Sequence, residues 1–284
     1  MTTINAPAHS GSAYRELIAR HPLFTFFTLA IVLTWIAASP ALFFGLPFQP
    51  YQTLGAYSPF MAAFLVSAVV NGRDGIRALL MRMTSWRFGL GSYLLAIFGL
   101  VILYILTVLL SGALPVQVLI DNWSLVFTFY LPALLTTYLV NPIGEETGWT
   151  GFALHHLQKQ FSPWFSALIL GILWAIWHLP AYFVPSGMGA FNLAGFAIFM
   201  LIAVFTRVIW TWVTNNAKGS GIAGVLLHAS SNAVSVGLLP LLLPTPQANQ
   251  ADDLSGPILL GLLFLFAVLI LLFTHGQLSY RSIE

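Results

Sequence analysis

Long apolar stretches that carry almost no charge are the feature that most constrains this chain. Of its 284 residues, 58% are hydrophobic and only 6% are charged, so little of the chain suits a water-facing surface. A helix needs about 20 mostly apolar residues to cross the hydrocarbon layer, and most of the stretches reach that length. Transmembrane β-barrels need alternating patterns instead, which these stretches do not follow. The sequence therefore predicts an all-α, polytopic transmembrane bundle of about eight helices.

Gly, Pro, Asn and Ser residues separate the predicted spans. We interpret residues 1–20 as a disordered cytoplasmic tail, 21–276 as a single transmembrane domain with its catalytic core at about 124–243, and 277–284 as a second cytoplasmic tail. The first span is too long for a signal-peptide core and is expected to remain, with cleavage after Ala37-Ala38-Ser39 as the alternative. The predicted spans are 21–46, 53–71, 91–114, 124–147, 163–182, 190–214, 220–243 and 255–274.

Basic residues near the ends of the spans predict the orientation. With eight spans and a cytoplasmic N-terminus, the Arg-rich segment 72–90, Lys159, Lys218 and Arg281 all fall on the cytoplasmic side. Basic residues in short loops are retained on that side. We therefore predict an integral protein of a bacterial-type plasma membrane with both termini in the cytoplasm. Because the basic residues are scattered rather than gathered into a patch, we expect no nucleic-acid partner.

Two adjacent carboxylates, Glu145 and Glu146, stand at the end of the fourth predicted span. A carboxylate at the bilayer centre costs roughly 2.5–3.5 kcal/mol, so a pair of them indicates a functional site. Consecutive helical residues point about 100° apart, so one carboxylate can face a cavity while the other contacts a neighbouring helix. Gly148 and Gly151 are small enough to let another backbone approach this helix closely.

Polar side chains on two further spans are the expected partners. His178 follows Trp174 by one helical turn, where the indole can shield the imidazole. His228 and Asn232 are four residues apart and share one helix face. Alone, each of these features is more typical of helix packing than of chemistry. Because intramembrane ionisable groups turn inward, all five polar residues are expected to meet in one water-filled cavity, which we expect to open to the cytoplasmic side or inner leaflet.

These groups fit hydrolysis. A carboxylate can take a proton from water, an imidazole can assist it or protonate a leaving amine, and an amide with an imidazole can stabilise an oxyanion. The chain has no cysteine, which excludes thiolate catalysis and cysteine-bound zinc. His178, His228 and Glu145 would make a zinc triad with an open fourth position. The same residues would serve equally in a metal-free glutamate mechanism.

Taken in order, the three motifs resemble those of the CPBP family, the Abi or CAAX-protease-and-bacteriocin-processing intramembrane proteases, which includes the type II CAAX prenyl endopeptidases. The family signatures are Glu-Glu-x-x-x-Arg, Phe-x-x-x-His and His-x-x-x-Asn/Asp. They correspond here to Glu145-Glu146 with Thr150, Trp174 with His178, and His228 with Asn232. The resemblance covers roughly residues 55–243.

The resemblance implies roles for these residues. Glu145 would be the water-activating base with His178 beside it, His228 and Asn232 would form the oxyanion site, and Glu146 would be a structural partner. The family's metalloprotease label favours zinc as the cofactor. The implied activity is intramembrane endopeptidase cleavage of a membrane-associated, lipid-modified or unmodified peptide. The implied partners are the lipid bilayer and that substrate.

Two positions depart from the family pattern. Thr150 replaces an arginine, which removes the cation that would pair with a carboxylate, and Trp174 replaces phenylalanine but keeps an aromatic wall. We predict that Arg207, in the sixth span, turns toward Glu145 and Glu146 and supplies the missing charge. His155 and His156, next to Lys159, are interpreted as markers of the membrane boundary.

Two other functions remain compatible with the sequence. A proton-coupled transporter can use intramembrane carboxylates and histidines as a relay. However, transporters usually show internal repeats, and no inverted repeat is visible here. The other alternative is a catalytically idle membrane scaffold or immunity protein, which the loss of the family arginine at Thr150 would suit.

Overall fold

The computed structural model describes residues 10–136, 139–184, 187–188, 191–243 and 245–281, and these are helical with short connections. The all-α prediction is therefore confirmed. The α-helices are α1 (Ser10–Arg20), α2 (Pro22–Phe44), α3 (Phe48–Ala56), α4 (Ser58–Met83), α5 (Leu90–Leu94), α6 (Leu100–Leu110), α7 (Val116–Asp121), α8 (Leu131–Thr136), α9 (Val140–Gly148), α10 (His155–Leu157), α11 (Pro163–Trp177), α12 (Leu193–Asn216), α13 (Gly221–Asn232), α14 (Leu239–Leu242) and α15 (Thr245–Phe273).

Six helical segments of the described chain are long and apolar enough to cross a membrane. A bent pair, Val126–Thr136 with Val140–Leu157, makes a seventh if it is counted as one span. The remaining predicted span, the fifth at 163–182, corresponds to α11, which has only 15 residues. At 1.5 Å per residue it is about 22 Å long, shorter than the hydrocarbon layer. It ends early because Pro180 follows and the chain continues as a 3₁₀ turn, Leu179–Tyr182.

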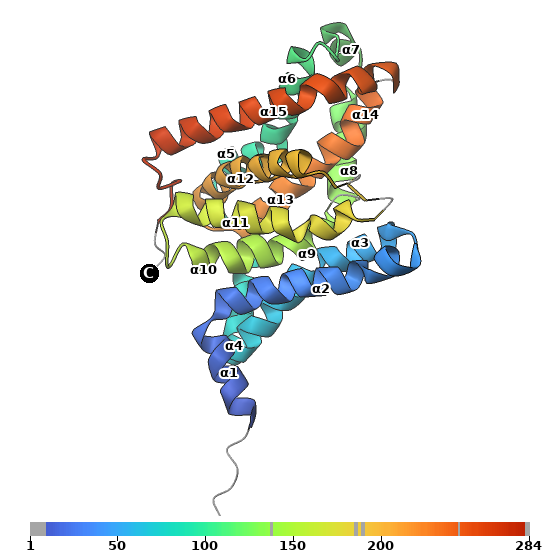
Figure 1. The fold of residues 1–284 in the computed structure, drawn as a ribbon. Helices are drawn as coiled ribbons and strands as arrows, with labels where there is room; N and C mark the ends of the chain where they lie inside the picture. The colour runs from blue at the N-terminus through green and yellow to red at the C-terminus, as the bar shows by residue number, and fades with distance from the viewer. Residues whose placement is uncertain (1–9, 137–138, 185–186, 189–190, 244, 282–284) are drawn as a thin grey trace, which may run out of the picture.

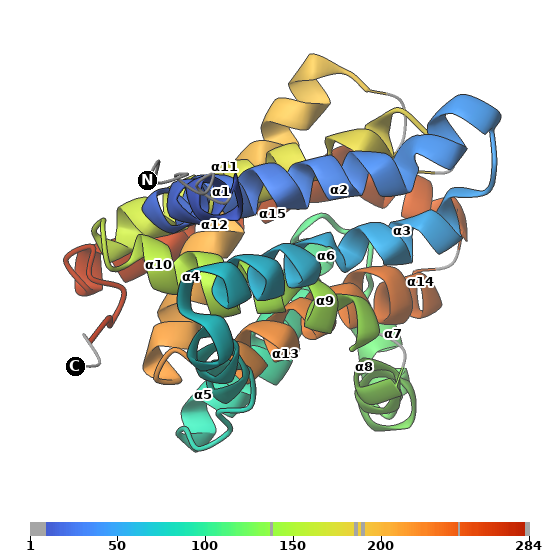
Figure 2. The same ribbon diagram turned by 90° about the horizontal axis from the view of Figure 1, so that it is seen from below.

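The helices carrying the predicted site lie in the middle of the bundle. Figure 1 shows α9, α11, α12 and α13 between α15 on one side and α2 with α4 on the other. Contacts between α4 and α9, α11 and α12, and α12 and α15 hold these layers together. Figure 2, seen from below, shows α2 in front of α11 and α15, with α4 beside it. The site helices are thus enclosed by the rest of the bundle.

Small residues let α9 and α4 approach closely, as the sequence predicted. A Cβ atom on Gly148 would lie 2.6 Å from the carbonyl oxygen of Pro59 at the start of α4. A Cβ on Gly144 would lie 2.8 Å from the carbonyl oxygen of Ala56. Because neither position has room for a side chain, the backbone of α9 is held against α3 and α4.

The predicted disordered N-terminal tail is partly helical, and the predicted C-terminal tail includes a buried residue. Residues 10–20 form helix α1 instead of a disordered tail, because Ile18 packs on the apolar core and the Arg15 Nε donates to the carbonyl oxygen of Val69, 3.2 Å away. Residues 1–9 lie outside the described residues. In the predicted C-terminal tail, Leu278 is fully buried, and its carbonyl oxygen accepts a hydrogen bond from Asn215. Residues 282–284 lie outside the described part.

Candidate active site

The two carboxylates occupy the second half of α9, immediately before the helix widens. Residues Trp149–Leu154 form a π-helical turn directly after α9, and Ala233–Leu238 form another directly after α13. Isolated π-turns inside α-helices are frequent at functional sites. Here each follows the predicted catalytic residues of its helix, Glu145 and Glu146 in one case and His228 and Asn232 in the other.

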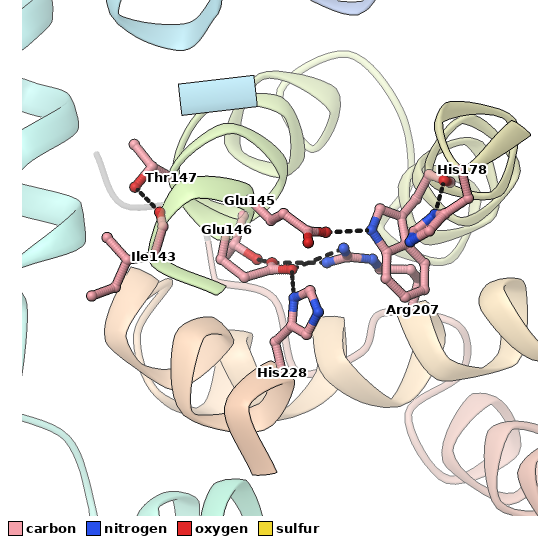
Figure 3. A network of polar contacts seen from close by, with 9 residues as sticks. Ile143, Glu145, Glu146, Thr147, His178, Arg207 and His228 are labelled. Atoms are coloured by element: carbon pink, nitrogen blue, oxygen red, sulfur yellow. Dashed lines mark hydrogen bonds and ion pairs between the residues drawn. The ribbon is translucent and has the colours of Figure 1, made fainter. Parts of the chain in front are cut away.

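Glu146 is fully buried in a cluster of polar groups from α9, α12 and α13 (Figure 3). Its Oε2 and Oε1 accept hydrogen bonds from Arg207 Nη1 and Nη2 at 2.8 and 2.9 Å. The hydroxyl of Thr150 donates to the Glu146 carboxylate, and His228 Nδ1 lies 3.0 Å from Glu146 Oε1. The prediction that Arg207 turns toward the carboxylate pair is therefore confirmed. Thr150 contributes a hydroxyl where the family has a cation.

The guanidinium of Arg207 also contacts two indole rings. Its central carbon lies 4.5 Å from the centre of the Trp174 ring and 4.9 Å from that of Trp210. A cation facing aromatic rings is stabilised by their quadrupoles, more strongly where water is excluded. The side chain of Arg207 is 1% exposed, so these contacts and Glu146 together compensate for burying its charge.

Glu145 runs beside Glu146 at the edge of this cluster (Figure 3), and its carboxylate is held by Trp174. The indole Nε1 donates to Glu145 Oε2 over 3.1 Å. The same ring meets His178 and His228 edge-on, with ring centres 4.8 and 5.8 Å away. Trp174 therefore touches Glu145 and both imidazoles. Phenylalanine at this position would keep the ring contacts but has no N–H to donate.

Hydrogen bonds determine which imidazole nitrogens are free. His178 Nδ1 lies 2.8 Å from the carbonyl oxygen of Trp174, and a carbonyl only accepts, so Nδ1 carries the proton. This leaves Nε2 of His178 available to a ligand. In His228 the Nδ1 faces the Glu146 carboxylate, which also only accepts, so Nε2 is again free. Backbone and carboxylate partners thus set the orientation of both rings.

Glu145 and His178 line one cavity of about 140 Å³. Asn141 lines it too, one helical turn before Glu145 on α9. The sequence analysis missed Asn141, although its spacing of four residues from Glu145 was a usable signal. The rest of the wall comes from α2, α3 and the residues after His178, including Thr34, Phe48, Gln52, Pro180 and Met188. Two of the five predicted site residues, Glu145 and His178, therefore face this cavity.

The position of the Glu145 cavity along α2 indicates in which half of the membrane this cavity lies. Pro22, at the start of α2, shares a small cavity with Lys159, whereas Thr34 and Ala38 line the Glu145 cavity. These residues lie on the order of 18–24 Å further along the helix. If the basic end is cytoplasmic as predicted, the cavity lies in the other half of the membrane. This differs from the expected cytoplasmic opening, because Glu145 and His178 both lie far along their helices from that end.

His228 and Asn232 occupy successive turns of α13. His228 is 5% exposed and joined to Glu146, whereas Asn232, the last residue of α13, is partly exposed. The Asn232 side chain makes no hydrogen bond to any described residue. Its amide is therefore free to bind a substrate group, but neither residue lines the cavity beside Glu145.

Glu145, His178 and His228, the residues predicted to hold zinc, are not placed to bind one metal ion together. Among the described residues, no three His, Asp or Glu side chains are placed to hold one metal ion. Trp174 contacts both imidazole rings edge-on and occupies one oxygen of Glu145. The geometry does not fit the triad of Glu145, His178 and His228 without rearrangement, so the mechanism below uses no metal step.

The segment that carries this site is similar to known proteins. Residues 127–234 match the family described as type II CAAX prenyl endopeptidase Rce1-like. A stretch of 106 residues is 30% identical to the CAAX prenyl protease 2 of Methanococcus maripaludis, covering 36% of this chain and 38% of that relative. The chain thus spans about two fifths of the length of the curated relative. The matched family segment contains Glu145, His178, His228 and Asn232, and the resemblance drawn from the three motifs is confirmed.

Proposed function

We propose that the chain is an intramembrane endopeptidase that hydrolyses a membrane-associated peptide, because residues 127–234 match the type II CAAX prenyl endopeptidase Rce1-like family. The observation that carries the proposal is the pairing of Glu145 with His178 at one cavity in an otherwise apolar bundle. A carboxylate and an imidazole beside a cavity are the groups that general acid–base hydrolysis needs. The substrate class includes lipid-modified tails.

In the proposed reaction, Glu145 takes a proton from a water molecule in the cavity. The water oxygen bonds to the scissile carbonyl carbon, and the carbonyl oxygen becomes an oxyanion. The bond between carbon and nitrogen then breaks, and the leaving amine takes the proton from Glu145, directly or through Nε2 of His178. The products are an amine and a carboxylic acid, which releases its proton to the surrounding water. Trp174 donates to Oε2 of Glu145, which leaves the other carboxylate oxygen, Oε1, to take the proton from water.

His228 and Asn232 are proposed to stabilise the oxyanion. The Asn232 amide has N–H groups to donate and makes no hydrogen bond to a described residue. His228 is held through Nδ1–H by Glu146, so it donates to the oxyanion from Nε2 only as the doubly protonated imidazolium, whose charge the Glu146 carboxylate stabilises. Donors of this kind contribute about 10²–10³-fold in turnover. Because these residues do not line the Glu145 cavity, the substrate carbonyl is proposed to reach from the cavity toward α13.

The test is cleavage of quenched membrane-associated peptides, with and without a prenyl group, by the purified full chain. Glu145→Gln keeps an oxygen to accept the Trp174 N–H but cannot take a proton from water. We expect it to fold normally and to lose about 10²–10⁴-fold in turnover. His178→Ala, His228→Ala and Asn232→Ala are each expected to lower turnover as well. Full cleavage by both Glu145→Gln and His228→Ala would refute the assignment.

The assay also separates the alternatives. Wild-type protein that folds but cleaves none of the peptides would favour an idle scaffold. Proton-coupled uptake into vesicles that Glu145→Gln abolishes, without any cleavage, would favour a transporter.

A further inference from the structure

A second, larger cavity opens at the other end of the bundle from the Glu145 cavity. Its volume is about 650 Å³, within the range of small-molecule sites. Three segments far apart in sequence form it: the chain around α10, the end of α12 and the C-terminal residues 280–281. It has no part in the hydrolytic mechanism proposed above.

The lining of this cavity is strongly basic. Lys159, Lys218 and Arg281 contribute one cation from each of the three segments, and none of the described residues that line the cavity is a carboxylate. None of the three forms an ion pair with an acidic residue in the described part of the chain. The ion pairs found there join Arg20 to Glu16, and Arg207 and His228 to Glu146. Like charges gathered without a counter-ion repel one another, so the cavity favours a bound anion.

Hydrogen bonds hold the wall between these cations in place. Gln158 Nε2 donates to Asn215 Oδ1 over 3.2 Å, and Asn215 Nδ2 donates to the carbonyl oxygen of Leu278 over 3.0 Å. This chain of bonds joins all three segments below the basic side chains. Lys218 has φ of 60°, a left-handed conformation that is unfavourable for lysine. The backbone segments that carry the three cations are therefore held in fixed positions relative to one another.

Thr150 closes the inner end of the cavity. It lines the cavity, and its hydroxyl donates to the Glu146 carboxylate. Glu146 is fully buried and shared with Arg207 and His228, so its charge is not available to the three cations.

We propose that this basic cavity, lined by Lys159, Lys218 and Arg281, binds a phosphate group. Lysine and arginine are the usual partners of phosphate, Arg through its fork of donors and Lys as a point charge. The cavity lies where the basic residues mark the predicted cytoplasmic boundary, so the phosphate comes from an anionic lipid headgroup or from free phosphate in solution. The volume leaves room for the glycerol part of a headgroup.

The experiment measures thermal unfolding of the full chain in uncharged detergent at constant ionic strength. Inorganic phosphate is titrated against chloride, and dihexanoyl phosphatidylglycerol against dihexanoyl phosphatidylcholine. A ligand that binds the folded state raises the unfolding temperature in a saturable way. We expect the rise in unfolding temperature to saturate with dihexanoyl phosphatidylglycerol. Each cation that is removed should raise the apparent Kd for this lipid about five-fold. A similar response to inorganic phosphate would identify free phosphate as a sufficient ligand.

Matched variants decide whether the effect belongs to the cavity. The double variant Lys159→Gln with Lys218→Gln should weaken binding, whereas Arg73→Gln with Arg77→Gln removes the same charge from the exposed face of α4 and should not. Equal weakening in both variants would show non-specific attraction and overturn the proposal. Absence of saturable binding by either probe would overturn it as well. If the lysine variant fails to fold, Arg281→Gln, at the end of the described chain, provides the same measurement.

Discussion

Arg207 on α12 binds Glu146 on α9 through two parallel hydrogen bonds of 2.8 and 2.9 Å, although the residues are 61 positions apart. This fork is the strongest geometry between a guanidinium and a carboxylate. Arg207 thus supplies from α12 the cation that the resembled Glu-Glu-x-x-x-Arg motif would carry at position 150, where this chain has Thr150.

Removing Arg207 should destabilise the protein strongly. In Arg207→Met, Glu146 is left as a buried charge without its cation, which typically costs about 3–5 kcal/mol. Thermal unfolding in detergent measures the effect. The control is Arg87→Met, which removes an exposed arginine and should change stability little. Similar stability in the two variants would show that the ion pair does not hold α9 and α12 together.

An arginine introduced at position 150 should partly restore the stability that is lost when Arg207 is removed. Thr150 borders the basic cavity, which gives a longer side chain room, whereas Gly224 blocks the other side because a Cβ there would lie 2.7 Å from Thr150 Oγ1. We expect Thr150→Arg to raise the unfolding temperature of Arg207→Met and to lower that of the wild type by adding a second buried cation. Thr150→Gln, similar in length but uncharged, should not rescue Arg207→Met. Equal rescue by Gln and Arg would contradict a requirement for charge at this position.

Trp174→Phe isolates the indole hydrogen bond to Glu145. The ring contacts with His178 and His228 are kept, so we expect normal folding and turnover lower on the order of ten-fold, consistent with losing one hydrogen bond to a charged group. Trp164→Phe is the control, because it makes the same substitution on α11 at a residue that does not line the Glu145 cavity. Kinetics on quenched peptides should separate the two variants, and equal turnover would remove Trp174 from the positioning of Glu145.

Zinc dependence is tested by metal analysis together with chelation. Since no described trio of His, Asp and Glu is placed to hold a metal ion, we expect cleavage to persist after extensive EDTA treatment. Should EDTA abolish cleavage and zinc restore it, with His178→Ala and His228→Ala each losing bound zinc, the ligands must rearrange around Trp174 to form the predicted triad.

The predicted topology places both termini in the cytoplasm. A reporter active only outside the cytoplasm, fused after the C-terminus, should therefore remain inactive, because Lys159, Lys218 and Arg281 all mark the same side. The same reporter fused in the loop after α2, near Gly45, should be active. Activity at the C-terminus would mean an odd number of spans or an inverted chain.

The sequence by itself determined the class of fold and the identity of the polar groups. Apolar length and scarcity of charge predict spanning helices, and the cost of burying Glu145, Glu146 and Arg207 requires each to find a partner inside the bundle. Helical periodicity also separates the directions of the two carboxylates. These conclusions follow from residue type and spacing along one helix, which do not depend on how the helices cross.

Only the tertiary structure decided which groups meet. The contact of Trp174 with Glu145, His178 and His228, the place of Asn141 in the cavity and the three-sided basic cavity all depend on distances between helices. Those distances are set by close packing at Gly144 and Gly148 and by π-turns that shift the helical register. Such features arise from the sum of many weak contacts between segments, and a pattern within any one segment does not contain them.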